Sequence, residues 1–127
     1  MEIIVDGYNV LKSTPLQGVS PFPDLDGGRI YLLDLLAEYK KLKGHSIKVV
    51  FDGWSRGGLS ELKEKYKGIL VIFSRRGETA DDLNKRMSKD GRGRAVVTSD
   101  RQIVDYVRQH GAESISSGDF YLTLTTM

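Results

Sequence analysis

Three short apolar runs in this chain each lead into an aspartate, a pattern typical of buried strands that end at a polar edge. The runs and their acids are Ile3–Val5 with Asp6, Val49–Phe51 with Asp52, and Val96–Thr98 with Asp100. In an open parallel sheet, the carboxyl ends of the strands line the ligand crevice. Carboxylates gathered there would repel one another unless a cation held them. The pattern therefore predicts an acidic metal site at one edge of a parallel sheet.

The alternation of strand-like and helical patterns predicts the fold class. A chain of 127 residues suits one compact domain, and we expect a single domain over residues 1–127. We expect a three-layer α/β/α sandwich around a mainly parallel sheet of four or five strands. The strands are expected at Glu2–Val5, Ser46–Phe51, Ile69–Phe73, Ala95–Thr98 and, as a short fifth strand, Glu113–Ile115.

The clearest helix signal covers Arg29–Lys43, where apolar residues recur with helical spacing and lysines close the last turn. Prolines and glycines between Asp6 and Gly28 predict a long loop that borders the crevice. The tail after Ser117 alternates like a strand but begins like a helix, and we favour the helix. Further helices are expected at Leu59–Tyr66, from Thr79 to about Lys89, and from a cap at Ser99 or Asp100 to His110.

Composition excludes several classes of protein and site. The chain has no cysteine, so it has no disulfide framework, thiolate nucleophile or cysteine-based zinc site. No apolar stretch approaches the roughly 18 residues of a membrane helix. The apolar start is short and is followed at once by an acid, unlike a signal peptide. We therefore expect a cytoplasmic protein with no membrane partner.

The acids form the strongest candidate site. Oxygen ligands prefer hard cations, so one or two Mg²⁺ or Mn²⁺ ions are favoured over zinc. Successive helical residues point about 100° apart, which favours Asp81 as a ligand with Asp82 in support. The candidate ligands are Asp6, Asp52, Asp81, Asp82 and Asp100, with Glu78, Asn9, Ser99 and Asp119 as accessory groups.

Each acid also has a structural explanation when it is taken singly. Asp81, Asp82 and Asp100 could complement or cap helix N-termini, and Asp6 and Asp52 could form turns with the glycines that follow them. Taken together, these explanations require several chain segments to place Asp at the same edge of one sheet, where ligands usually bind. The joint pattern favours a site.

The basic residues suggest a polyanionic partner. A net charge of +2 says little alone, but acids gathered in one crevice leave a basic exterior, which suits a polyanion held by its backbone. The lysine clusters Lys40–Lys43 and Lys63–Lys67 are more simply explained as solvated faces. Candidate nucleic-acid contacts are Arg75, Arg76, Arg92 and Arg94 in predicted loops, and Tyr8 and Trp54 near the crevice. Core packing would explain Tyr8 and Trp54 equally well.

Other catalytic arrangements are weaker. His45 and His110 lie beside glycines at predicted helix ends, where a cationic histidine suits the helix dipole. The chain has no nucleophile elbow, phosphate loop or Gly-x-Gly-x-x-Gly motif. A phosphoryl-transfer enzyme with Asp6 or Asp52 as nucleophile is the more distant alternative. It lacks the second acid of an Asp-x-Asp pattern, since Tyr8 stands there.

Four motifs together resemble a known family. They are Asp6-Gly7-Tyr8-Asn9, Val50-Phe51-Asp52, Glu78-Thr79-Ala80-Asp81 and Val97-Thr98-Ser99-Asp100. In this order and spacing they resemble the NYN-domain ribonucleases of the PIN-like superfamily. The YacP-like bacterial branch, which includes a ribosome-associated endoribonuclease, is the most similar. The resemblance runs from Ile3 to about Phe120.

The resemblance implies a PIN-like fold whose acids bind Mg²⁺ or Mn²⁺ and hydrolyse RNA. Asp6, Asp81 and Asp100 match the core acids of that family and Asp52 a further acid of its crevice, while Asn9 and Ser99 match its polar supports. We therefore expect a metal-dependent endoribonuclease, with the ribosome as a candidate partner. The alternative is a non-catalytic RNA- or ribosome-binding module of the same fold.

The oligomeric state stays open at this point between a monomer and a weak dimer. Tyr31, Leu35 and Tyr39 share one side of the helix expected at Arg29–Lys43. They could form part of a dimer face, but burial of that helix against its own sheet explains them equally well.

Overall fold

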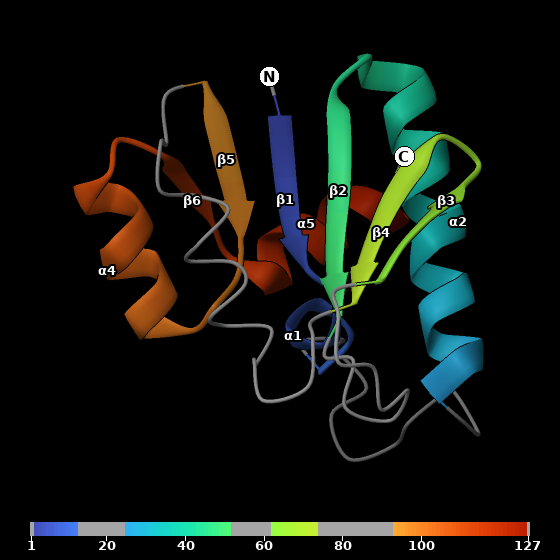
Figure 1. The fold of residues 1–127 in the computed structure, drawn as a ribbon, viewed down its shortest axis with the longest axis horizontal. Coiled ribbons are helices and arrows are strands. Elements are labelled where there is room, and N and C mark those ends of the chain that lie inside the picture. The colour runs from blue at the N-terminus through green and yellow to red at the C-terminus, as the bar shows by residue number, and fades with distance from the viewer. Residues whose placement is uncertain (1, 13–24, 52–61, 74–92, 127) are drawn as a thin grey trace.

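A six-stranded sheet forms the centre of the protein, in the strand order β3–β4–β2–β1–β5–β6 (Figure 1). The computed structural model describes residues 2–12, 25–51, 62–73 and 93–126. Neighbouring strands are parallel except for the antiparallel pair β3 and β4. The strands are β1 (Glu2–Asp6), β2 (Ser46–Phe51), β3 (Leu62–Tyr66), β4 (Ile69–Phe73), β5 (Arg94–Val97) and β6 (Glu113–Ile115).

The sheet confirms the five expected strands and adds one that the sequence did not predict. The short helix expected over Leu59–Tyr66 is wrong, because β3 pairs with β4 as a hairpin. Tyr66 pairs with Ile69, so only Lys67 and Gly68 form the turn, with φ angles of 48° and 86°. A two-residue hairpin turn with positive φ at both positions matches the right-handed twist of the strands. The turn therefore decides between helix and strand here.

Four helices are described: α1 (Gly7–Lys12), α2 (Leu25–Lys43), α4 (Arg101–Gln109) and α5 (Ser117–Thr125). The loop expected after Asp6 is wrong at both its ends, because α1 begins directly after Asp6 and α2 begins before Arg29. The favoured helix in the tail is confirmed as α5, whose N-cap Ser116 accepts a hydrogen bond from the Asp119 amide. The helix expected from Thr79 to Lys89 lies outside the described residues.

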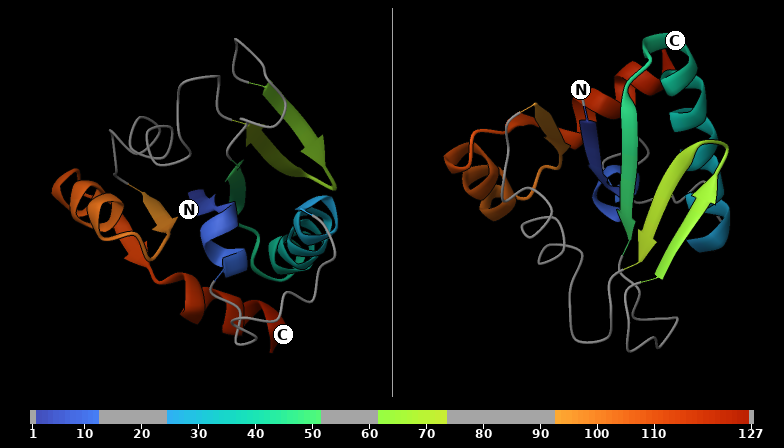
Figure 2. Two further views of the ribbon diagram at one scale, coloured as in Figure 1. Left: turned by 90° about the horizontal axis from the view of Figure 1, so that it is seen from below. Right: turned by 45° about the horizontal axis from the view of Figure 1, so that its top comes forward.

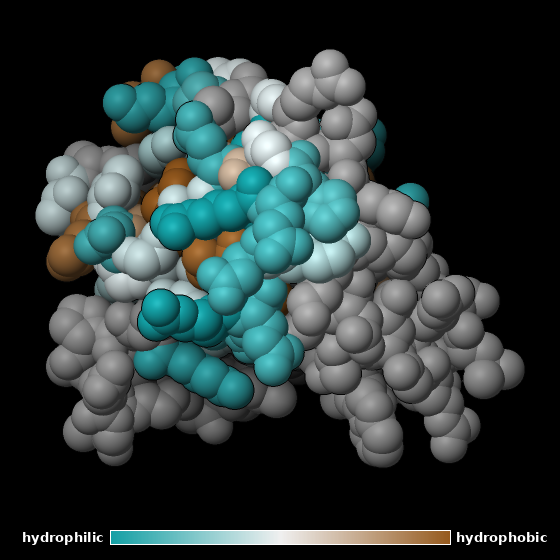
Figure 3. Space-filling model, turned by 90° about the vertical axis from the view of Figure 1, so that its left-hand side faces the viewer, coloured by the Kyte–Doolittle hydropathy of each residue, from teal (hydrophilic) through white to brown (hydrophobic). Residues whose placement is uncertain are grey.

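The described helices cover both faces of the sheet, which confirms the α/β fold class (Figure 2). On one face α1, α2 and α5 pack on alternate residues of the strands, such as Ile3 and Val5 of β1. On the other face α4 buries Ile103 and Val107 against a cluster that includes Ile4. The outward side of the molecule at α4 is largely hydrophilic (Figure 3). Among the described residues, no helix is long and apolar enough to cross a membrane.

The side of α2 that was considered as a dimer face packs largely within the chain. Leu35 and Tyr39 lie against the core, and the Tyr39 ring meets the edge of Phe120 at 5.3 Å between centroids. Tyr31 is 37% exposed, and its hydroxyl lies 3.4 Å from that of Tyr121. These contacts explain Leu35 and Tyr39 by packing within the chain.

Polar contacts fasten the β3–β4 turn to α2. The Lys40 ammonium donates a hydrogen bond of 2.7 Å to the Gly68 carbonyl. Asp34 Oδ1 accepts one hydrogen bond from Lys67 Nζ and one from the Tyr66 hydroxyl, each of 2.9 Å. These two donors, Lys67 first, hold the pKa of Asp34 below its usual value.

We expect Gly7→Ala to destabilise the protein. A Cβ on Gly7 would lie 2.6 Å from Cδ1 and 2.8 Å from Cζ of Phe51. The Phe51 ring is fully buried between Tyr8 and Phe73, so it cannot move aside. Overpacking of this kind costs about 1–3 kcal/mol, measurable as a lower free energy of unfolding in urea. Gly118→Ala is the control, since a Cβ there meets nothing within 4 Å. Equal losses in both variants would contradict the packing argument.

Asp34 is expected to contribute a pH-dependent part of the stability. Because its folded-state pKa is lowered, its stabilisation is present above the unfolded-state pKa and is lost as the pH falls through the folded value. Asp34→Asn removes this titration, so the difference in unfolding free energy between the two proteins should shrink as the pH is lowered below the ordinary range of Asp. Urea unfolding over a series of acidic pH values measures it, and a constant difference would contradict the assignment.

Candidate active site

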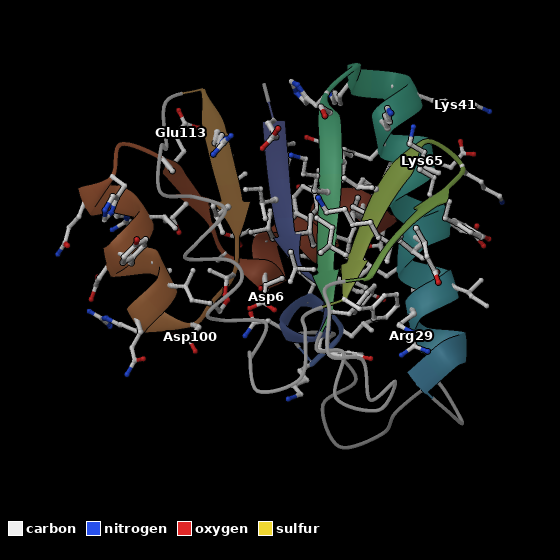
Figure 4. All side chains as sticks on the ribbon, in the orientation of Figure 1. Asp6, Arg29, Lys41, Lys65, Asp100 and Glu113 are labelled. Atoms are coloured by element: carbon white, nitrogen blue, oxygen red, sulfur yellow. The ribbon has the colours of Figure 1, made fainter. Side chains whose placement is uncertain are left out.

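Two of the predicted acids lie at the carboxyl edge of the sheet (Figure 4). Asp6 is the last residue of β1 and is only 4% exposed. Asp100 follows the neighbouring strand β5 and is the N-cap of α4. The parallel pairing of β1 and β5 brings both chain segments to one end of the sheet, as the sequence pattern predicts.

Thr98 connects these two acids. Its hydroxyl donates a hydrogen bond of 3.1 Å to Asp6 Oδ2 and accepts one of 3.1 Å from the Asp100 amide. The Thr98 side chain is fully buried. From the sequence, Thr98 was predicted to end a strand and was part of the motif Val97-Thr98-Ser99-Asp100, with no site role of its own. The available signal was a polar residue closing an apolar strand, two positions before a helix cap.

Asp100 uses only one of its carboxylate oxygens in its contacts with the described residues. Oδ1 accepts hydrogen bonds from the amides of Gln102 at 2.9 Å and Ile103 at 3.3 Å, which confirms the expected N-cap. Oδ2 makes no hydrogen bond with the described part of the chain. Asp100 can therefore cap α4 and offer a ligand oxygen at the same time, so the two explanations considered for this residue are compatible.

Asn9 joins three segments beside the acids. Its Oδ1 accepts hydrogen bonds from the Ser99 amide at 2.8 Å and from the Ser117 hydroxyl. Ser99 Oγ in turn accepts a hydrogen bond of 3.0 Å from the Ser117 amide. The network ties α1 and the start of α5 to the segment between β5 and α4. Ser117 is fully buried, and the sequence marked it only as the start of a helix. Asp119 lies exposed in the first turn of α5, where an acid suits the helix dipole.

Tyr8 is held by packing and by a buried arginine. Its ring lies 4.9 Å from that of Phe51, and its hydroxyl accepts a hydrogen bond of 2.8 Å from Arg29 Nη1. Arg29 is only 9% exposed, and its guanidinium lies 5.6 Å from the centre of the Phe73 ring. These contacts favour the packing explanation for Tyr8 over base stacking. No pattern in the sequence marked Arg29 as a buried residue of this edge.

Arg94 lies at the opposite, amino end of the sheet. It is the first residue of β5 rather than part of a loop, and its Nε lies 3.1 Å from Glu2 Oε1. Lys48 Nζ pairs with the other oxygen of Glu2 at 3.3 Å. The structure therefore does not bring Arg94 to the acids, and its side chain has a structural partner.

The remaining predicted site residues fall outside the described residues, and their roles stay predictions. Within residues 2–12, 25–51, 62–73 and 93–126, no three His, Cys, Asp or Glu side chains gather into a group that could hold a metal ion. Asp6 and Asp100 supply carboxylate oxygens, the donor type that suits a hard divalent cation. The residues outside the described ranges are Asp52, Asp81, Asp82, Glu78, Arg75, Arg76, Arg92 and Trp54.

Comparison with known families decides the wider assignment. Residues 3–127 match the model of the YacP-like NYN domain. The chain belongs to the YacP-like NYN domain family. This confirms the resemblance inferred from the motifs.

Relatives from Bacillus subtilis agree with this assignment. The uncharacterized protein YacP of strain 168 is 31% identical over 87 residues, which cover 68% of this chain and 51% of the relative. The chain thus spans about half the length of that relative. The crystal structure of Rae1 (YacP) matches with a TM-score of 0.78 at 26% identity, over 99% of this chain and 74% of the other. Its W164L mutant matches with a TM-score of 0.79 at 24% identity, over 98% and 75%.

We expect Thr98→Val to weaken the acidic edge. The change keeps the shape of the side chain but leaves Asp6 Oδ2 and the Asp100 amide without the hydroxyl they share. Loss of a partner by a buried polar group costs about 1–3 kcal/mol, which urea unfolding would detect. Thr98→Ser keeps the hydroxyl and should retain most of the stability. Equal stability of Thr98→Val and the parent protein would contradict a role for this hydroxyl.

Proposed function

We propose that this protein is a metal-dependent endoribonuclease that hydrolyses RNA phosphodiester bonds at the edge containing Asp6 and Asp100. The observation that carries the proposal is the Thr98 hydroxyl, which holds the Asp6 carboxylate and the Asp100 amide together at the carboxyl edge. A buried carboxylate held in place beside a second acid with a spare oxygen is a suitable start for a cation site. Family membership supports the ribonuclease part of the proposal.

The proposed ligands of Mg²⁺ or Mn²⁺ are Asp6, Asp81 and Asp100, with Asp52 contributing directly or through water. When bound, such an ion lowers the pKa of a water molecule and stabilises charge on the leaving oxygen of a phosphodiester. Asp6 cannot turn away from the edge without losing the Thr98 hydrogen bond. The Asp6 carboxylate therefore needs little reorganisation to receive a cation, which is the usual protein contribution to such sites.

The remaining parts of the proposal concern substrate and setting. Arg75, Arg76 and Arg92 are proposed to contact the phosphates, and Glu78 and Asp82 to support the ligands. We propose a cytoplasmic location and ribosome-associated mRNA as one candidate substrate, both on the strength of the resemblance to the YacP-like branch. The Asn9–Ser99–Ser117 network is proposed to keep the edge rigid during cleavage.

Asp100→Asn tests the nuclease directly. Asn is as good an N-cap as Asp, so α4 and the free energy of unfolding should be preserved. The variant loses the carboxylate charge, and cleavage of labelled RNA in Mn²⁺ or Mg²⁺ should fall by roughly 100-fold or more, since even outer partners of a metal site are worth about 10–100-fold. EDTA should abolish cleavage by the parent protein.

Asp105→Asn is the matched control. It makes the same change in charge on the same helix, at an exposed position. This control should cleave like the parent protein. RNA binding without cleavage by the parent protein in any metal would contradict the nuclease proposal and favour a non-catalytic binding module.

A further inference from the structure

A second charged surface lies at the other end of the molecule from the acids. The last turn of α2 and the β3–β4 hairpin both lie at the amino end of the sheet, because α2 ends shortly before β2 begins and the hairpin turn immediately precedes β4. Lys41 and Lys65 mark these two segments in Figure 4, at the end opposite to Asp6 and Asp100. Neither segment is used by the proposed active site.

The fold brings Lys67 of the hairpin turn to the lysines in the last turn of α2, although the two segments are separate in the sequence. Hydrogen bonds from Lys40 to Gly68 and from Tyr66 and Lys67 to Asp34 hold the hairpin turn against α2. Among the lysines of this surface all are exposed except Lys40, which is partly buried. The lysines are Lys40, Lys41 and Lys43 on α2 and Lys67 at the hairpin turn, with Asp34 and Glu38 as the nearby acids. Lys63 and Lys65 pair with Ile72 and Leu70 of β4 and so lie on the other face of the sheet.

A groove runs between these segments. Its volume is about 520 Å³, and its walls are formed by Ala37, Glu38, Lys40, Lys41 and Lys67. Three ammonium groups thus line one concave surface with a single carboxylate. Lys40 and Lys67 each use one donor in the hydrogen bonds that hold the hairpin, and an ammonium group has three. Donors therefore remain for a ligand.

A helix-dipole effect explains only part of this arrangement. Lysines in the last turn of a helix interact favourably with its C-terminus, which accounts for Lys40, Lys41 and Lys43. It does not account for Lys67, which comes from the neighbouring hairpin turn. The juxtaposition of Lys40, Lys41 and Lys67 around one groove points instead to an anionic partner.

We propose that this lysine groove binds the phosphate backbone of RNA, remote from the acidic edge. The inference rests on the proposed function, in which RNA is the polyanion that the protein binds. Because α2 has 19 residues, it extends about 28 Å at 1.5 Å per residue, so a bound RNA must be longer than this to occupy both ends. The groove contributes affinity without sequence selectivity, since lysines contact phosphate rather than base edges.

Salt dependence of RNA binding tests the groove without cleavage. Binding of a labelled single-stranded RNA longer than α2 is measured in EDTA over a series of salt concentrations. Removal of one lysine that binds a phosphate should reduce the slope of log affinity against log salt by about 0.7 for a single strand. Lys41→Gln should lower the slope by about this amount. Lys65→Gln makes the same change in charge on the other face of the sheet and should leave the slope unchanged. Neither side chain has a hydrogen bond or ion pair with the described residues, so both variants should fold.

The control and the parent nuclease keep the two proposals separable. Arg108→Gln removes one exposed positive charge from α4 and should leave the slope unchanged. A slope for Lys41→Gln equal to those of the parent, Lys65→Gln and Arg108→Gln would overturn the groove, even if the parent cleaves RNA. If Lys41→Gln reduces the slope but the parent protein never cleaves RNA, the groove is supported and only the nuclease proposal fails. Binding of the lysine surface to phosphatidylserine-containing vesicles but not to RNA would also overturn it.

Discussion

The Thr98 hydroxyl is the group on which the acidic edge depends. It accepts a hydrogen bond from the Asp100 amide and donates one to the Asp6 carboxylate, so one buried side chain fixes the end of β1 relative to the start of α4. A buried carboxylate without such a donor would be costly. The hydrogen bond to Asp6 therefore lowers the cost of burying this carboxylate and also fixes its position at the edge. It lets Asp6 remain in a nearly closed site, and it places Asp100 where one oxygen caps a helix and the other faces no described partner.

Two different charged surfaces lie at opposite ends of the sheet. Asp6 and Asp100 lie where the parallel strands end, and the lysines of the last turn of α2 and of the hairpin lie where they begin, at the same end as Glu2 and Glu113. The sequence carries both in a chain of nearly balanced charge, so composition alone conceals the separation. A polyanion approaching such a molecule meets attraction at one end and needs cations to approach the other. Under the proposed function, the metal would offset the repulsion at the acidic end.

Much of this arrangement could be predicted from periodicity. Parallel strands such as β1 and β2 are buried on both faces and appear as continuous apolar runs, so their ends and the acids that follow were visible. The β3 strand was missed because Leu62–Tyr66 is mostly charged and its pairing depends on the positive φ angles of Lys67 and Gly68. Propensity does not reveal that geometry when Lys occupies the first turn position.

The site was predicted less completely than the fold. Asp6 and Asp100 follow directly from the strand ends, but Thr98, Ser117 and Arg29 act through contacts between segments distant in the chain. Such contacts leave no local pattern that identifies the distant partner. The misplacement of Arg94 has the opposite cause, since glycines around it suggested a loop while Glu2 holds it in a strand.

The position of β3 also has a consequence for association with other chains. As the outermost strand of the sheet, it has one side that no other strand of the described sheet pairs with. An edge of this kind can recruit a strand from another molecule, and lysines are a common means of discouraging it. Lys63 and Lys65 occupy alternate positions of this strand, and their charges oppose pairing of the edge with a strand of another molecule. The same side chains would then serve colloidal stability in the free protein, and any variant that neutralises them would also weaken its protection against aggregation.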